Sequence, residues 1–488
     1  MDASSQSRGL RRWGDSSFVK LVMLAFLVLV LLLPVARVRS LIYEREGRRG
    51  EVAREVTRVW GEAQTLNGPI LNVQVRQWIE GRPGHGAAEG MVLGPSVSGK
   101  AKAKSSTDAE EPGTELTRAW ESSIVHLLPR QLTWRGRVVP QIRYRGIFEV
   151  IVYETHLEAA GVFEIPDLEA PDREVDWETA DLVLGISDVR GLQERVELRW
   201  QDQEVDLLPG TGGAPFVQSG VFSRIPGEER LAPGTRIPFS FELVLRGSDQ
   251  LLFVPSGAET HVELDSPWAS PSFVGAFLPD RRQVSDTGFS ASWQVPLFGR
   301  SFPSQWSGNP ELAGAFESSA FGVGLLLPVD AYQQSERAVK YAVLFIVLTF
   351  GTFFLLELLS PVRLHAVQYL LVGFAQTLFY VLLLALSEHL GFGRAYALAA
   401  AATVGLIASY SRSILASRRR ALVVLGCLGL LFGYLYVLLQ LEDYALLVGA
   451  SGLFVALAVT MLATRHLDWF TLRFAPADAS ADGEGTPT

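Results

Sequence analysis

The organisation of this chain is decided by residues 328–373, which read PVDAYQQSERAVKYAVLFIVLTFGTFFLLELLSPVRLHAVQYLLVG. Short Val-, Ile- and Phe-rich runs precede this stretch, and long apolar runs follow it. Asp330 and Gln333 have capping-box spacing, and no Gly or Pro occurs after them until Gly351. The sequence therefore predicts one helix from Asp330 to about Glu357, roughly 40 Å long. A helix of that length can cross a bilayer and link the two halves of the chain.

Composition indicates a protein that is part soluble domain and part membrane. The chain has 488 residues, of which 48% are hydrophobic and 19% are charged. A formal net charge of −9 argues against a nucleic-acid partner, because such binding depends on neutralising phosphates. Cys427 is the single cysteine and lies in an apolar run, where a packing role is expected. An intrachain disulfide and a CxxC metal site are therefore excluded.

The N-terminal region predicts a membrane anchor. Residues 18–36 are apolar apart from Lys20 and are flanked by arginines on both sides. The run is longer than the apolar part of most signal peptides, and no small-x-small cleavage motif precedes its basic exit. A retained signal anchor is thus favoured over a cleaved signal peptide. Residues 51–63 then have helical apolar spacing and predict a separate, short amphipathic helix that stops at the Asn67-Gly68-Pro69 turn.

The middle of the chain predicts a large β-rich domain. Short runs rich in Val, Ile, Phe and Trp are bounded by Gly, Pro, Asp and Asn, a pattern typical of strands. They lie at 70–75, 146–153, 182–186, 196–200, 239–245, 251–254, 289–293 and 321–327. One large sandwich and two smaller β units both fit this pattern. Residues 81–117 interrupt it with a Gly-, Ser- and Lys-rich stretch that predicts a disordered insert.

Four further apolar segments, near 367–386, 395–410, 421–439 and 445–462, predict a helical membrane bundle. With the anchor and the linking helix they make six spans, which place both termini on one side. If that side is cytoplasmic, the inner segments hold eleven basic residues, whereas the two short outer loops hold only Arg394. The positive-inside rule therefore predicts cytoplasmic termini and an extracytoplasmic β domain.

Candidate functional residues in the membrane half are ionisable groups near the ends of the spans. They are Glu357, Arg363, His365, Glu388 and His389. Charges in a membrane are costly and are functional candidates by default, although groups near loops remain hydrated. Arg363 is close enough in sequence to pair with Glu357. Glu388 and His389 could bind a proton or a metal, but two neighbouring residues do not make a metal site.

The β domain shows no catalytic signature. Its glycines and serines form neither a GxSxG elbow nor a phosphate-binding loop, and its histidines are scattered singly. Asp188 and Arg190 predict a turn stabilised by an ion pair. The aromatic side chains Trp268, Phe273 and Phe277 come from a Pro-rich stretch that excludes a regular helix. A buried structural plug is favoured for them over an exposed recognition loop, because three exposed aromatics would form an apolar patch.

Several long motifs, in order along the chain, resemble the CreD family of bacterial inner-membrane proteins, which are also called cell envelope integrity proteins. They are GPILNV (68–73), ISDVRG (186–191), SPWASPSFVGAFLPDRRQVSDTGFSASWQ (266–294), PVDAYQQSERAVKYA (328–342), ELLSPVRLHAVQYLLVGFA (357–375) and LLLALSEHLGF (382–392). The resemblance implies an inner-membrane protein linked to envelope maintenance and to tolerance of envelope stress. It supplies no catalytic residue and no ligand.

These observations lead to one overall expectation. We expect a cytoplasmic N-terminus and transmembrane anchor (1–40), a periplasmic β-rich domain (41–329), a transmembrane helical bundle (330–470) and a disordered cytoplasmic tail (471–488). The expected function is non-catalytic support of envelope integrity, without a cofactor or a metal. The expected partners are the lipid bilayer together with envelope proteins or lipids. The alternative is a transporter or lipid-handling protein that uses the intramembrane acids.

Overall fold

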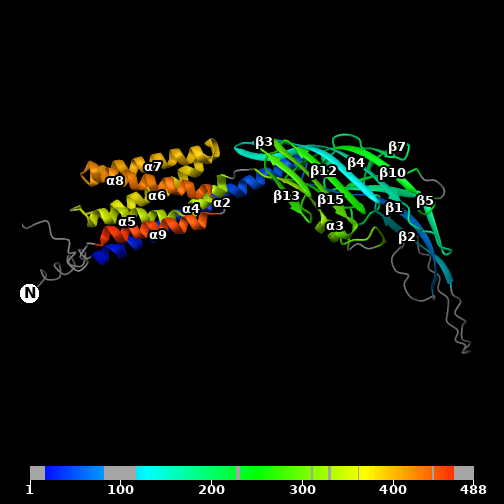
Figure 1. Cartoon of the computed structure of the whole chain (residues 1–488), viewed down its shortest axis with the longest axis horizontal. Coiled ribbons are helices and arrows are strands. Elements are labelled where there is room, and N and C mark those ends of the chain that lie inside the picture. Colours follow the sequence, from blue (N-terminus) through cyan, green and yellow to red (C-terminus); the bar gives the residue numbers. More distant parts are fainter. Residues whose placement is uncertain are drawn as a thin grey trace, which may run out of the picture. The chain divides into compact units, whose positions relative to one another are not determined.

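A computed structural model describes residues 17–81, 117–226, 231–308, 312–327, 331–360, 362–441 and 444–465. Its two compact units are a helical unit, formed by residues 1–52 and 329–488, and a β unit, formed by residues 53–328 (Figure 1). The expected insert within 81–117, the tail from 471 and the cap at Asp330 lie outside the described residues, except for Gly81 and Thr117 at the ends of two strands.

The β unit contains two sheets, and every run that the sequence predicted as a strand overlaps one of their strands. One sheet has nine strands, in the order β13-β17-β11-β1-β5-β9-β8, with β2 on β1 and β16 on β2. The other has eight strands, in the order β14-β15-β12-β3-β4-β10-β6-β7. The strands are β1 (Gln64–Gly81), β2 (Thr117–Leu127), β3 (Gln131–Arg145), β4 (Phe148–Glu164), β5 (Arg173–Ile186), β6 (Glu197–Trp200), β7 (Gln203–Asp206), β8 (Leu208–Pro209), β9 (Gly220–Arg224), β10 (Arg236–Ser248), β11 (Gln250–Phe253), β12 (Glu259–Ser266), β13 (Pro271–Gly275), β14 (Arg281–Ser285), β15 (Gly288–Pro296), β16 (Gln305–Ser307) and β17 (Phe321–Leu325).

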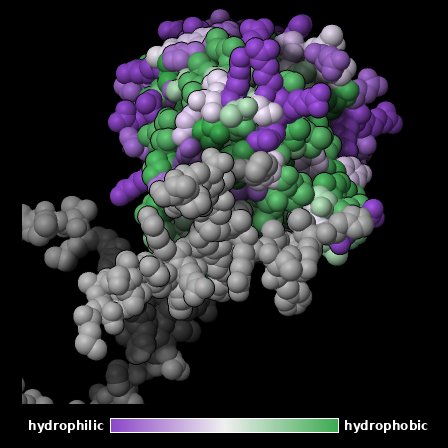
Figure 2. All heavy atoms as spheres, turned by 90° about the vertical axis from the view of Figure 1, so that its left-hand side faces the viewer, coloured by the Kyte–Doolittle hydropathy of each residue, from purple (hydrophilic) through white to green (hydrophobic). Residues whose placement is uncertain are grey.

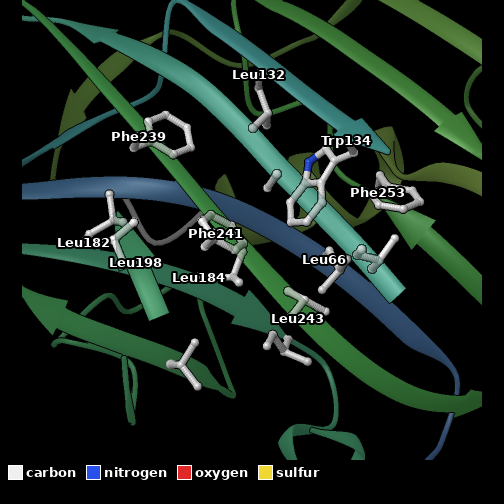
Figure 3. Packing of buried hydrophobic residues seen from close by; sticks show 14 of the residues in the cluster. Leu66, Leu132, Trp134, Leu182, Leu184, Leu198, Phe239, Phe241, Leu243 and Phe253 are labelled. Atoms are coloured by element: carbon white, nitrogen blue, oxygen red, sulfur yellow. The ribbon is translucent and has the colours of Figure 1, made fainter. Parts of the chain in front are cut away.

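A single main core lies between the two sheets. Along β10, Phe239, Phe241 and Leu243 are buried at every second position, as expected for a strand with one face in a core. Trp134 of β3 packs against Phe241 and against Phe253, with ring centroids 5.6 and 5.5 Å apart (Figure 3). Full burial of each such side chain contributes about 1.5–3 kcal/mol. Because this core joins both sheets, the β region is one unit and not two.

A second, smaller core lies beside the first and contains Ile70, Val183 and Phe216. Helix α3 (Leu312–Ser319) contributes Phe316 to it, and β16 contributes Trp306. The His126 ring contacts Phe216 and Trp306, with centroids 4.8 and 5.3 Å away. The amphipathic character of α3 explains its place, because its apolar side closes this second core.

The helical unit contains the long helix α2 (Ser17–Trp60) as far as residue 52. It also contains the helices α4 (Ala331–Lys340), α5 (Ala342–Leu358), α6 (Ala366–Leu390), α7 (Phe392–Ile414), α8 (Arg418–Gln440) and α9 (Ala445–Thr464). Figure 1 shows α5 to α9 running alongside one another. In the described part of the chain, five helices can cross a membrane, and α4 with α5 forms a sixth, bent candidate. The fold class expected from the sequence is confirmed.

The linking helix is not continuous as predicted. Helices α4 and α5 meet at Tyr341 with a bend of 46°. The chemistry of the helix changes at this point, because α4 carries Glu336, Arg337 and Lys340 whereas α5 is apolar up to Glu357. A polar-faced helix and an all-apolar helix suit different surroundings, so the break follows the boundary between them.

The anchor is longer than predicted. One helix runs from Ser17 to Trp60, in place of an anchor that ends near residue 40 and a separate helix at 51–63. Pro34 and the two glycines Gly47 and Gly50 are accommodated within it. The helix ends at Gly61, where φ is +145° and a Cβ atom would lie 2.6 Å from the Arg246 carbonyl oxygen. This close approach requires glycine.

The surface of the helical unit is apolar over wide areas. Exposed Leu, Val and Phe side chains occur along α6, α7, α8 and α9, and no described residue of α9 is buried. Hydrophobic residues form broad areas of the face drawn in Figure 2. An exposed apolar surface of this extent is what a lipid-facing helix presents.

Candidate functional site in the helical unit

The first cluster surrounds Glu357 near the end of α5. Its side chain is almost fully buried, with only 1% of the residue exposed. Lys20 of α2 donates to its Oε1 atom, and the two form an ion pair. The backbone N–H of Leu364 donates to the same oxygen over 3.1 Å, and the Tyr369 hydroxyl donates to Oε2 over 3.1 Å. We call these four residues the inner cluster.

Within the inner cluster, both carboxylate oxygens of Glu357 accept hydrogen bonds, and Lys20 balances its charge. A buried carboxylate is tolerated only when it is paired and hydrogen-bonded, because desolvation of an ion costs several kcal/mol. Three elements contribute here, since Lys20 belongs to α2, Glu357 to α5 and Tyr369 to α6. Phe350 and Phe353 pack edge-on against the Tyr369 ring, with centroids 5.5 and 6.3 Å away. The arrangement therefore ties three helices together at one point.

The second cluster surrounds Glu388 near the end of α6. The Tyr332 hydroxyl of α4 donates to Glu388 Oε1 over 3.1 Å, and Arg45 Nη1 of α2 lies 3.9 Å from Oε2. One turn after Tyr332 in α4, Glu336 accepts a hydrogen bond from the Tyr43 hydroxyl over 2.7 Å and pairs with Arg39 over 3.4 Å. We call these residues the outer cluster. The outer cluster joins α2 to α4 and α6, and its groups are more exposed than those of the inner cluster.

The other predicted membrane residues, Arg363, His365 and His389, are exposed. His365 is exposed and begins α6, where its side chain and that of Gln368 form a reciprocal cap. Arg363 is exposed, and the charge that pairs with Glu357 comes from Lys20. His389 is exposed and adjacent to Glu388. Within the described ranges, no group of three or more His, Cys, Asp or Glu side chains could hold a metal ion.

The aromatic residues singled out in the β unit are half-buried. Trp268, Phe273 and Phe277 all pack against the main core. Phe273 contacts Phe289 and Trp293 with ring centroids 5.9 Å away in each case, and Phe277 contacts Phe321 at 5.6 Å. The Trp268 indole N–H donates to the carbonyl oxygens of Ser270 and Leu326. The structure thus places these rings where they fill space at the edge of the core.

The predicted pairing in the turn at 186–191 is confirmed. Arg190 Nε lies 2.8 Å from Asp188 Oδ1, and the Glu62 backbone N–H donates to Asp188 Oδ2 over 3.1 Å. Burial acts to raise the pKa of Asp188, but the hydrogen bonds from Arg190 and Glu62 and the charge of Arg190 together hold that pKa below its usual value. Trp60, at the end of α2, has Arg143 and Arg246 within 4.5 and 4.4 Å of its ring. These contacts hold the last turn of α2 on the β unit.

Comparison with known proteins agrees with this architecture. A family model described as "Inner membrane protein CreD" matches residues 16–470. The curated inner membrane protein CreD of Escherichia coli strain K12 is 32% identical over 470 residues, which cover 95% of this chain and 96% of that protein. The chain belongs to the CreD family. Membership extends over both units, so the helical unit and the β unit together form the shared architecture.

A solved structure of an M1 zinc metallopeptidase from Deinococcus radiodurans is also similar in part. It is 12% identical over 35% of this chain and 40% of that chain, with a TM-score of 0.18. A similarity of this size carries no argument about the CreD chain.

Sequence reasoning missed most of the partners in these two clusters. It identified Glu357 and Glu388 but not Lys20, Tyr369 or Arg45 as the groups that satisfy them. A signal was present, because Lys20 is the single charged residue in the apolar run 18–36. A lone cation in one predicted span and a lone acid in another are candidates for pairing. In this CreD-family chain the two are 337 residues apart in sequence.

Proposed function

We propose that this protein is a non-catalytic membrane protein that supports cell envelope integrity and tolerance of envelope stress. Its β unit faces the periplasm, and both termini lie in the cytoplasm. The observation that carries the proposal is the closed set of contacts around Glu357. An acid that exchanges a proton or a ligand needs access, whereas each oxygen of Glu357 already accepts a hydrogen bond from the chain. Family membership over residues 16–470 supports the same role.

A second element of the proposal is mechanical. The chain passes between its two units within α2, near residues 52 and 53, and again near residues 328 and 329. Helix α2 has contacts with the inner cluster in the helical unit and, through Trp60, with the β unit, which supports a coupling role. We infer that this helix passes a change in one unit on to the other.

A deletion strain tests the role in the envelope. Under envelope stress, we expect loss of this gene to increase sensitivity to detergents and to cell-wall antibiotics. The intact gene and the exposed variant His389→Ala should restore tolerance, and Lys20→Met should restore less. Unchanged sensitivity of the deletion strain would show that the proposed role is wrong.

Reporter fusions test the orientation. A fusion near Ser105 is expected to behave as periplasmic and one near Arg419 as cytoplasmic, because the basic residues of the short loops gather on one side. The opposite result at either position would overturn the topology.

A transporter or lipid-handling protein is the second candidate. It is favoured by polar atoms that are buried in the helical unit without a partner among the described residues, namely Gln334 Oε1, Ser335 Oγ and Gln376 Oε1. Reconstituted protein can be assayed for movement of protons and phospholipids. Flux that depends on Gln376, and that is lost in Gln376→Leu at normal abundance, would favour this candidate over the first.

A further inference from the structure

The second core of the β unit contains a buried cation. Only 8% of Arg300 is exposed. Its Nη1 atom donates to the Ser256 carbonyl oxygen over 3.1 Å, and Nη2 donates to the Ser304 hydroxyl. The guanidinium lies 5.0 Å from the centre of the Phe302 ring. Its Nε atom is buried and has no hydrogen-bond partner in the described part of the chain.

No acid among the described residues balances this charge. Burial lowers the pKa of Arg300 to about 10, with no opposing contribution from a carboxylate. Glu259, at the start of β12, is exposed and accepts a hydrogen bond from Gln131. Arginine is almost never fully buried unless it is paired, because an isolated buried charge is costly. The counter-charge is therefore expected from outside the described chain.

The second core and the side chains next to it hold two further donors without a partner among the described residues. Trp306 Nε1 and Asn72 Nδ2 are also buried without partners. Asn72 of β1 is the cross-strand neighbour of His126, which in turn is the neighbour of Trp306 in β16. The Nδ1 atom of His126 lies 2.7 Å from Asn72 Oδ1, so that acceptor is already used. In this core, the buried side-chain atoms that lack a partner among the described residues are all N–H donors.

We propose that Arg300 anchors a binding site for a small oxyanion, a carboxylate or a phosphate ion, in the second core of the β unit. An oxyanion supplies both the negative charge and the acceptors that this core lacks. The planar guanidinium matches such groups well, because its Nε–H and a free Nη–H can donate in parallel to two oxygens. The Ser256 carbonyl oxygen accepts from Nη1 and the Ser304 hydroxyl accepts from Nη2, and these two hydrogen bonds orient the guanidinium group. This inference is independent of the proposed role in the envelope.

The test uses the full chain in detergent micelles. Thermal unfolding of the β unit and isothermal titration are measured with inorganic phosphate and with acetate, against chloride at matched ionic strength. A ligand that binds the folded state alone raises Tm, and we expect a rise of about 2–4 °C with the preferred ion at saturation. The comparison between acetate and phosphate identifies which oxyanion is preferred. No rise and no heat of binding with either ion would overturn the proposal.

Variants locate the site. Arg300→Met should abolish the response, and Arg300→Lys should weaken it, because lysine keeps the charge but loses the fork. Arg281→Met, at an exposed position of the edge strand β14, is the matched control and should respond as the wild type does. A full response in Arg300→Met would rule the site out. If Arg300→Met does not fold, the milder Ser304→Ala is used, and its affinity should fall several-fold.

One alternative source of charge lies within the chain. Glu311 is the acid nearest to Arg300 in sequence and lies outside the described residues. If Arg300 binds an external ion, Glu311→Gln should respond to phosphate or acetate as the wild type does. A response that appears only in Glu311→Gln would show that this carboxylate fills the site and that the proposal is wrong.

Discussion

Two ion pairs of helix α2, one in each unit, differ in their exposure to water. In the helical unit, Lys20 pairs with Glu357, and the two side chains are 17% and 0% exposed. In the β unit, Glu55 pairs with Arg145, and both side chains are more than half exposed. Water screens the Glu55–Arg145 pair and hydrates both groups when they separate. The buried carboxylate of Glu357 has no water to replace Lys20. We therefore expect the Lys20–Glu357 pair to stabilise the fold and the Glu55–Arg145 pair to have little effect.

The largest expected effect follows from removing Lys20. Lys20→Met leaves the buried carboxylate of Glu357 without its cation, and we expect a loss of about 3–5 kcal/mol in the free energy of unfolding. Denaturation in mixed micelles and abundance in membranes measure this loss. Adding Glu357→Gln should recover much of the stability, since no charge is then buried alone. Lys340→Met, at an exposed lysine, is the control. A Lys20→Met variant as stable as the wild type would remove the contrast between the two regions.

A smaller effect is expected at Asp188, which is buried but close to the surface of the β unit. Asp188→Asn removes a carboxylate that accepts from the Glu62 N–H and from Arg190. Hydrogen bonds to charged groups contribute about 1.5–3 kcal/mol, so a loss in that range is expected. Chemical denaturation followed by tryptophan fluorescence measures it. Asp206→Asn, at an exposed position, should change stability little. Equal losses in both variants would mean that the turn at Asp188 has no special role.

The third prediction concerns pH and the same carboxylate. The pKa of Asp188 is lower in the folded protein than its ordinary value of 3.8. Below that ordinary value the unfolded chain binds the proton first, so the stabilisation present at neutral pH is lost as the pH falls below about 4. The difference in unfolding free energy between the wild type and Asp188→Asn should therefore shrink in acid. A difference that stays constant from pH 7 to pH 3 would contradict this assignment.

The smallest effect is expected for the exposed pair. Glu55→Gln should change the unfolding free energy by less than about 1 kcal/mol, and the change should diminish further at high salt. The measurement is the same denaturation series at low and high ionic strength. A loss as large as that of Lys20→Met would show that exposure does not decide the strength of these pairs.

Much of the fold follows from local sequence patterns. The apolar pattern at 239–245 predicts a strand and the apolar run at 367–386 predicts a span, and both lie within observed elements, β10 and α6. Both signals are local, because the period of a strand or helix places neighbouring residues on one face. The break at Tyr341 and the length of α2 were not predictable in the same way. Propensity permits a helix across 331–358 and permits a stop near residue 40, so the surroundings of each segment decide the outcome.

The candidate site shows the same division. Local patterns predict a β-rich unit and membrane spans, and they identify Glu357 and Glu388 as costly groups in or near those spans. The pairing of Lys20 with Glu357, and the burial of Arg300 beside serine oxygens instead of a carboxylate, emerge only when distant segments pack together. The physical reason is that burial and pairing depend on which distant segments pack together. Lys20 and Glu357 are 337 residues apart, so no local sequence pattern contains both of them.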